Sequence, residues 1–270
     1  MPAISIGFNR FLCLFLLLSP TISTAADSLP KLTDSDLLWL GERIFANECN
    51  SRFECLTSWN EGEAFPSLGI GHFIWYQQGQ QEVFEETFPA LLDWMQQSGA
   101  KLPTWIAQMP EPESPWQTRE QFLAETNSTR STELRQFLAV TQALQVAFIV
   151  QRLQLLRLDL FTDLNRDTNA ELEHRFFTVA NDTPPYGIYA LIDYLHFKGS
   201  GLNPAERYAD TGWGLLQVLE TMQGYDLNSF VAAADEVLAR RVHNAPIARN
   251  EQRWLNGWHN RIRGYLPLNR

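Results

Sequence analysis

The chain has 270 residues, of which 45% are hydrophobic, and it carries a formal net charge of −10 at neutral pH. This length can bury one substantial hydrophobic core. The acidic excess argues against nucleic acid as a partner, because the phosphate backbone is itself a polyanion. It is equally unfavourable for contact with an anionic cell wall.

The first 26 residues have the pattern of a secretory signal peptide. Arg10 precedes an apolar run at 11–18, and small residues follow up to Ala26. The run is too short to cross a bilayer, and this order of segments is typical of a signal removed after export. We therefore expect a periplasmic or secreted mature protein, residues 27–270, without a further membrane span. A retained N-terminal anchor is the alternative.

Helical periodicity dominates the mature sequence. The first helix is predicted from Asp34 to Glu48, and residues 53–76 are the only stretch with convincing strand character. The sequence therefore predicts a single α+β domain, mostly α, with a small β hairpin at about 53–76 and a helical lobe at about 81–270. Within that lobe, helices are expected near 81–98, 117–125, 131–158, 168–180, 184–198, 211–223, 227–242 and 246–264.

The first predicted helix ends in a carboxylate on its apolar side. At 100° per residue, Leu37, Ile44 and Glu48 lie on one stripe. The apolar neighbours and the negative end of the helix dipole both favour a neutral Glu48 carboxyl. A neutral carboxyl is the form that a general acid needs. The alternative is a frayed helix end that exposes this side chain to water.

Two cysteines in the mature sequence are close enough to each other to form a short loop. Cys49 and Cys55 are expected to form a disulfide in an oxidising compartment, and two free thiols are the alternative. No second Cys or His pair completes a tetrahedral set with them. We therefore expect no metal, and no motif in the sequence predicts a cofactor.

The segment Ser-Leu-Gly-Ile-Gly-His follows a turn that holds Glu61 and Glu63. Strand alternation places Ser67, Gly69 and Gly71 on one face. This face has almost no side chains, so a ligand could lie against its backbone. We expect Glu63 and the two glycines to contact substrate.

The opposite face of the same segment has core character. It consists of Leu68, Ile70 and His72. We therefore expect His72 to be a buried, hydrogen-bonded structural histidine rather than a catalytic one.

The order of these residues is similar to the catalytic segment of phage-type lysozymes in the lysozyme-like superfamily. There a helix-ending Glu precedes an Asp in a β hairpin and then Thr-Ile-Gly-Ile-Gly-His; the match covers residues 40–76. The resemblance implies that Glu48 is the general acid. It further implies that Glu61 stabilises charge or activates water, and that Ser67 helps to place that water.

The match leaves rivals for two of these roles, because the spacing from the helix-ending acid to the serine is longer here. Glu54 competes with Glu48, and Glu63 competes with Glu61. Trp213 begins a later helix in a Thr-Gly-Trp-Gly context similar to a helix start in the same superfamily. It could stack on a sugar ring or be an ordinary core residue. Segment 193–198, which mixes polar and aromatic residues, is a further candidate for lining the cleft.

The resemblance implies an exported, muramidase-like glycoside hydrolase that cleaves peptidoglycan or a related amino-sugar polymer such as chitosan by carboxylate acid catalysis. A lytic transglycosylase, in which the sugar's own 6-hydroxyl attacks, stays open. The alternative class is a non-catalytic envelope protein that binds a glycan or a protein on a lysozyme-like scaffold. A buried Glu48 that faces Ser67 across a cleft favours the enzyme, whereas a salt bridge at Glu48 favours the binding protein.

Overall fold

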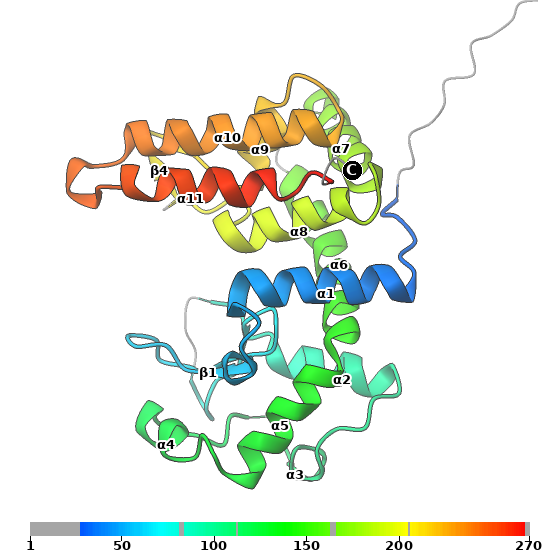
Figure 1. The fold of residues 1–270 in the computed structure, drawn as a ribbon, viewed down its shortest axis with the longest axis vertical. Helices are drawn as coiled ribbons and strands as arrows, with labels where there is room; N and C mark the ends of the chain where they lie inside the picture. The colour runs from blue at the N-terminus through cyan, green and yellow to red at the C-terminus, as the bar shows by residue number, and fades with distance from the viewer. Residues whose placement is uncertain (1–27, 81–83, 112, 163–165, 205, 268–270) are drawn as a thin grey trace, which may run out of the picture.

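The described part of the chain is mostly helical and contains a small antiparallel sheet (Figure 1). The predicted signal peptide lies outside the described residues. Within the described part, no helix is both long and apolar enough to cross a membrane. The computed structural model describes residues 28–80, 84–111, 113–162, 166–204 and 206–267.

The elements follow one another with short connections. The helices are α1 (Asp34–Cys49), α2 (Phe88–Gln97), α3 (Thr104–Ala107), α4 (Arg119–Ala124), α5 (Thr129–Val140), α6 (Gln142–Phe161), α7 (Arg166–Asn181), α8 (Tyr186–Lys198), α9 (Leu215–Thr221), α10 (Leu227–Asn244) and α11 (Gln252–Arg263), with 3-10 turns η1 (Phe53–Leu56) and η2 (Ile247–Arg249). The strands are β1 (Thr57–Ser58), β2 (Ser67–Leu68), β3 (Phe73–Ile74), β4 (Arg207–Tyr208) and β5 (Thr211–Gly212).

Helix α1 begins and ends as its sequence predicts. The Thr33 side chain caps the Asp36 amide while the Asp36 carboxylate accepts from the Thr33 amide, so both orphan donors are satisfied. Asn50 ends the helix in the left-handed conformation that Asn tolerates better than most residues. The buried face includes Leu40 and Ile44 and packs along α6.

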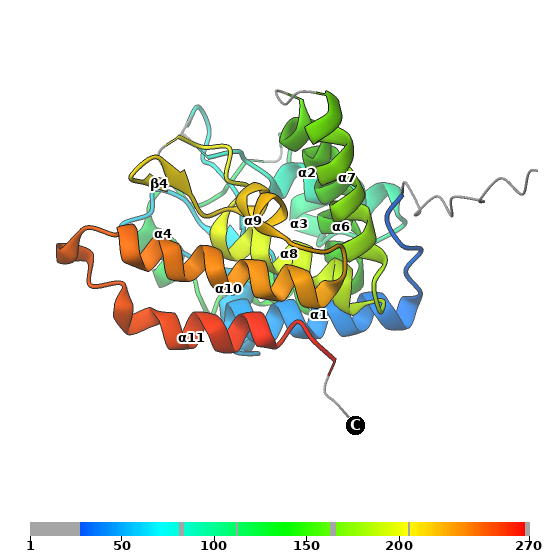
Figure 2. The same ribbon diagram turned by 90° about the horizontal axis from the view of Figure 1, so that it is seen from above.

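Two groups of elements lie on either side of α1 and α6 (Figure 1). We call β1–β3 with α2–α5 the hairpin lobe and α7–α11 the helical lobe. Helix α6 runs from the first lobe to the second, and α1 crosses it. Figure 2 shows α10 and α11 side by side along one edge of the helical lobe.

The predicted hairpin is a three-stranded antiparallel sheet in the order β1-β2-β3. Thr57 pairs with Leu68, and Ser67 pairs with Ile74. The tight connection between β2 and β3 requires positive φ at Gly69 (71°) and at His72 (48°). Leu68 is fully buried, in agreement with the predicted core face.

The sequence pattern misplaced several helix boundaries. Helix α2 begins at Phe88 rather than near 81, and α11 begins at Gln252 rather than near 246. The expected helix at 131–158 is two helices, because the chain breaks at Thr141 between α5 and α6. The expected helix at 211–223 starts later, since β5 occupies its first residues and α9 begins at Leu215. In the last two places apolar residues continue through the break, so hydrophobic periodicity alone gives no boundary.

Candidate functional site

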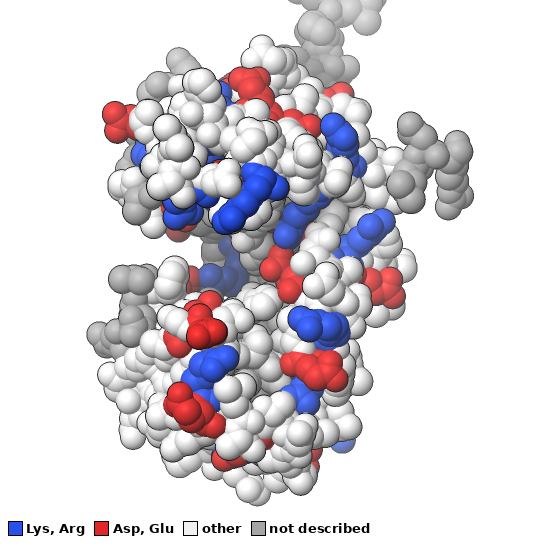
Figure 3. Space-filling view, turned by 60° about the vertical axis from the view of Figure 1, so that its left-hand side comes forward, with Lys and Arg blue, Asp and Glu red and all other residues white. Residues whose placement is uncertain are grey.

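A cleft of about 790 Å³ opens between the two lobes, where Figure 3 shows a deep hollow. Glu48 lines it from the end of α1, Glu63 and Ser67 line it from the hairpin lobe, and His196 lines it from α8. Four of the predicted or suspected residues therefore meet on one surface. We call the α1, α8 and α11 side the helical wall and the side formed by residues 60–74 the hairpin wall.

A second cavity of about 390 Å³ adjoins the cleft. His72 and His196 line both spaces, so the two cavities are neighbours at these residues. The smaller cavity is mostly apolar, with side chains such as Ile149 and Leu153 from α6.

Glu48 is neither frayed nor surrounded only by apolar groups. Its side chain is 24% exposed, and its Oε1 atom accepts a hydrogen bond of 2.6 Å from Nη2 of Arg261. An adjacent guanidinium favours a carboxylate ion. Arg261 on α11 is thus a cationic partner of the predicted acid, although the two residues are 213 positions apart along the chain.

The same guanidinium binds Asp193 on α8. Nε and Nη2 of Arg261 each donate at 2.8 Å to the Asp193 carboxylate, which is buried. Burial lowers the pKa of Arg261, but the hydrogen bonds to Asp193 and Glu48 outweigh this effect, and the net shift is upward. Arg261 is therefore a fixed positive charge between two carboxylates.

Further donors complete the shell of Asp193. Tyr265 donates its hydroxyl at 2.6 Å and Asn47 donates its amide at 2.8 Å. Asn47 also donates to the Tyr189 hydroxyl at 2.6 Å. Burial, followed by the charge of Asp193, raises the pKa of both Tyr265 and Tyr189, so both phenols stay protonated.

His196 is a cleft residue to which the sequence assigned no role. Solvent reaches its side chain, but protein surrounds the floor of the cleft. The surrounding protein removes water from the imidazole and so lowers the pKa of His196, although the charges of Glu48 and Asp193 act in the opposite direction. The imidazole is therefore neutral at neutral pH and can accept a proton or a hydrogen bond.

The turn of the hairpin wall separates the two candidate acids. Glu63 lines the cleft, and its carboxylate accepts a hydrogen bond of 3.1 Å from the Asn60 amide. Its carbonyl oxygen accepts from the indole of buried Trp59 at 2.8 Å, which fixes the turn. Glu61 is exposed and does not line the cleft.

The two glycines do not form the open face that alternation suggested. A Cβ atom on Gly69 would lie 2.3 Å from Oε1 of Gln145, and one on Gly71 would lie 2.7 Å from the Phe73 ring. Gln145 on α6 also accepts a hydrogen bond of 2.8 Å from the Ile70 amide. Protein therefore occupies the space expected for ligand at Gly69, whereas Gly71 reaches only the smaller cavity.

Trp213 lies away from the cleft. It is 7% exposed and packs between the Tyr208 ring, 4.6 Å away, and the Arg241 guanidinium, 4.1 Å away. Its carbonyl accepts a hydrogen bond from buried Tyr194. These contacts are those of a core tryptophan, so the structure gives no support to sugar stacking at this residue.

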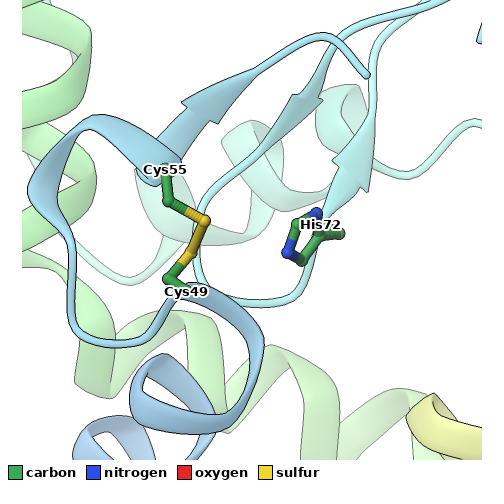
Figure 4. A group of neighbouring side chains, drawn as sticks. All are labelled: Cys49, Cys55 and His72. Carbon is green, nitrogen blue, oxygen red and sulfur yellow. A yellow bond between two sulfur atoms is a disulfide. The ribbon is translucent and has the colours of Figure 1, made fainter. Parts of the chain in front are cut away.

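The predicted disulfide between Cys49 and Cys55 is present. His72 lies beside it (Figure 4) and differs from the expected buried, hydrogen-bonded histidine. The residue is only half-buried and lines the cleft, and its Nε2 atom is buried without a hydrogen-bond partner among the described residues.

The sequence gave no signal for Arg261 or Gln145. It indicated Asp193 only as part of segment 193–198, a candidate for lining the cleft, and it gave this residue neither a role nor a partner. Chemically, the cleft is lined by two carboxylates from different elements, a hydroxyl and two imidazoles.

In comparisons with known proteins, the chain matches no family model, no curated protein and no solved structure.

Proposed function

We propose that the chain is an exported glycosidase of lysozyme-like fold that cleaves an amino-sugar polymer in the cleft between its lobes. One observation carries the proposal: Glu48, Glu63 and Ser67, from three positions in the chain, line the same cleft. The order of these residues along the sequence is that of the phage-type lysozyme segment. Cleavage of a glycosidic bond needs two carboxylates on one surface, of which one delivers a proton.

The charge balance of the helical wall favours Glu48 as the proton donor. Two carboxylates share the single guanidinium of Arg261, so these three groups carry a net charge of −1. Asp193 accepts four hydrogen bonds from the surrounding protein, whereas Glu48 accepts one and faces the cleft. Glu48 is therefore the carboxyl group of this wall that can reach a bound polymer and deliver a proton to the leaving oxygen.

The hairpin wall supplies the second carboxylate. We assign this role to Glu63 rather than Glu61, because only Glu63 lines the cleft. Its charge stabilises the cation that develops on the sugar, or it activates water that Ser67 helps to place. Attack by water gives a hydrolase, and attack by the sugar's own 6-hydroxyl gives a lytic transglycosylase.

Product release from purified polymers tests the proposal. The wild-type protein and its Glu48→Gln variant are incubated with peptidoglycan and, separately, with chitosan, whose positive charge suits a chain of net charge −10. We expect release by the wild type and a loss of about 10²-fold or more in the variant. Mass spectrometry then distinguishes reducing ends from anhydro ends.

Matched controls come from the same elements. Glu42→Gln alters an exposed carboxylate on α1, and Glu61→Gln alters the exposed acid of the hairpin turn. Both should keep the activity of the wild type. Equal activity in wild type and Glu48→Gln would refute acid catalysis by this residue.

The second candidate function is a non-catalytic protein that binds the same polymer. The salt bridge from Arg261 to Glu48 favours it, because a permanently ionised Glu48 cannot donate a proton. In this case wild type and Glu48→Gln bind the polymer equally, and neither releases product.

A further inference from the structure

We propose that reduction of the Cys49–Cys55 disulfide creates a binding site for a thiophilic cation such as Zn²⁺ at the edge of the cleft. The site consists of two thiolates and the imidazole of His72. It is independent of glycan cleavage, because its geometry and its test involve metal binding alone.

Three ligand atoms already lie together in the oxidised protein. The two sulfur atoms and a ring nitrogen of His72 are all within 4.8 Å of one another (Figure 4). They come from three elements: Cys49 ends α1, Cys55 lies in η1, and His72 precedes β3. The fold therefore brings the ligands together, and a metal ion is not needed to do so.

The histidine side of the site is not used elsewhere. Nε2 of His72 is buried and has no hydrogen-bond partner among the described residues. A buried polar atom without a partner is costly and calls for an explanation. A metal ion bound at Nε2 would satisfy this nitrogen, which the rest of the fold leaves without a partner.

The distances suit a tetrahedral cation once the sulfur atoms are free. Zinc binds thiolate sulfur at about 2.3 Å and imidazole nitrogen at about 2.0–2.1 Å, so tetrahedral ligand atoms lie about 3.5–3.8 Å apart. In the oxidised protein the three ligand atoms all lie within 4.8 Å of one another. The two bonded sulfur atoms must therefore move apart, and each must settle at this distance from the His72 nitrogen; the exposed residues Ser51 and Arg52 lie between the two cysteines.

The group of ligand residues contains no fourth protein ligand among the described residues. His72 lines the cleft, and Glu48, which directly precedes Cys49, is held by Arg261 at 2.6 Å. Water from the cleft therefore completes the coordination. Three protein ligands and one open position are the arrangement of reactive zinc sites, whereas closed structural sites use four protein ligands.

The redox step balances with an external reductant. A phosphine and one water molecule convert the disulfide to two thiols and a phosphine oxide: phosphorus is oxidised, the sulfur–sulfur bond breaks, and the water supplies the oxygen and both protons. A dithiol protein achieves the same reduction by exchange and becomes a disulfide itself. Binding of the cation then releases the two thiol protons.

Cobalt titration of the purified protein tests the proposal. Co²⁺ reports thiolate ligation through a sulfur-to-metal charge-transfer band, and a phosphine reductant avoids competing thiols. We expect one equivalent of Co²⁺ to bind with this band after reduction, none to bind in the oxidised protein, and none in the Cys49→Ser/Cys55→Ser variant. Binding by the oxidised protein with the same spectrum would overturn the proposal.

A histidine pair distinguishes a folded site from two loose thiols. His72→Asn removes the imidazole while keeping a residue that tolerates positive φ. His243→Asn, at an exposed position on α10, is the matched control. After reduction, Co²⁺ should bind His72→Asn at least tenfold more weakly than His243→Asn. Equal affinity of the two variants for Co²⁺ would overturn the proposal. The same holds if reduction unfolds the segment around the disulfide and the two thiols bind the metal without His72; circular dichroism detects such unfolding.

Discussion

The two walls of the cleft differ in how far their polar groups are satisfied by protein. On the helical wall, Asp193 accepts four hydrogen bonds, and one guanidinium holds both it and Glu48. On the hairpin wall, Glu63 has a single amide partner, and the Ser67 hydroxyl makes no hydrogen bond with the described residues. The helical wall thus fixes geometry, and the hairpin wall keeps polar groups available to a ligand. Substitutions in the Asp193 network should therefore affect folding, whereas substitutions at Glu63 and Ser67 should affect ligand chemistry.

The largest effect on stability is expected for Asp193→Ala. Removal of this buried carboxylate leaves Arg261 with only Glu48 as its counter-charge and leaves the Tyr265 hydroxyl without its acceptor. Breaking a buried ion pair by removing one partner costs about 3–5 kcal/mol. Urea unfolding measures the loss, and Asp159→Ala, at an exposed position on α6, should stay within about 0.5 kcal/mol of the wild type. A loss below about 1 kcal/mol for Asp193→Ala would contradict a rigid helical wall.

Gln145 anchors the hairpin wall to α6, and Gln145→Leu should loosen this wall. The substitution leaves the buried Ile70 amide without its acceptor and the Leu138 carbonyl without its donor. An unsatisfied buried group costs about 1–3 kcal/mol. We also expect faster hydrogen exchange at the Ile70 amide. Gln151→Leu, at an exposed position on the same helix, is the control; unchanged exchange at Ile70 would show that other contacts hold the hairpin.

The sequence predicted the features that depend on local pattern. Helix α1 with Glu48 at its end, the disulfide of Cys49 with Cys55, and the sheet region followed from capping, spacing and alternation. The assignment between Glu61 and Glu63 was open, because alternation does not extend through a turn. Here the turn is set by Trp59, whose indole binds the Glu63 carbonyl.

The helical wall could not be predicted, because its contacts are non-local. Arg261 meets Glu48 over 213 positions and Asp193 over 68 positions of sequence. Gln145 reaches the hairpin over 75 positions. Charged and amide residues on helices are usually solvated, so a single sequence gives no reason to pair these in particular.

The helical lobe also contains a buried lysine that loses its charge on folding near neutral pH, and Lys198→Met should stabilise the protein. Lys198 is 8% exposed and lies 3.4 Å from the ring centroid of Trp258. Burial, helped by the charge of Arg241, lowers the pKa of Lys198 to about 6 from its ordinary value of 10.5. Between these two pH values the unfolded chain binds a proton that the folded chain does not, so stability rises with pH.

The gain from Lys198→Met should therefore be greatest at pH 6 and below and disappear near pH 10.5. At neutral pH we expect roughly 1–3 kcal/mol, comparable to the cost of a buried group without a hydrogen-bond partner. Thermal unfolding at pH 6, 8 and 10 measures the trend. Lys101→Met, at an exposed position, should show no such pH dependence. A gain independent of pH would mean that packing alone, and not the charge, causes it.

The smallest effect on stability is expected on the hairpin wall, for Glu63→Gln. A glutamine oxygen can still accept the Asn60 hydrogen bond, and the turn depends on the Glu63 carbonyl rather than on its side chain. The free energy of unfolding should therefore change by less than about 0.5 kcal/mol.

Product release by Glu63→Gln should nevertheless fall by about tenfold or more, because the amide cannot stabilise a developing cation. Glu61 lies in the same turn but outside the cleft. Glu61→Gln should therefore change neither the free energy of unfolding nor product release. If Glu63→Gln instead destabilised the fold as strongly as a change at Asp193, both walls would be structural, and the cleft would lose its assigned ligand side.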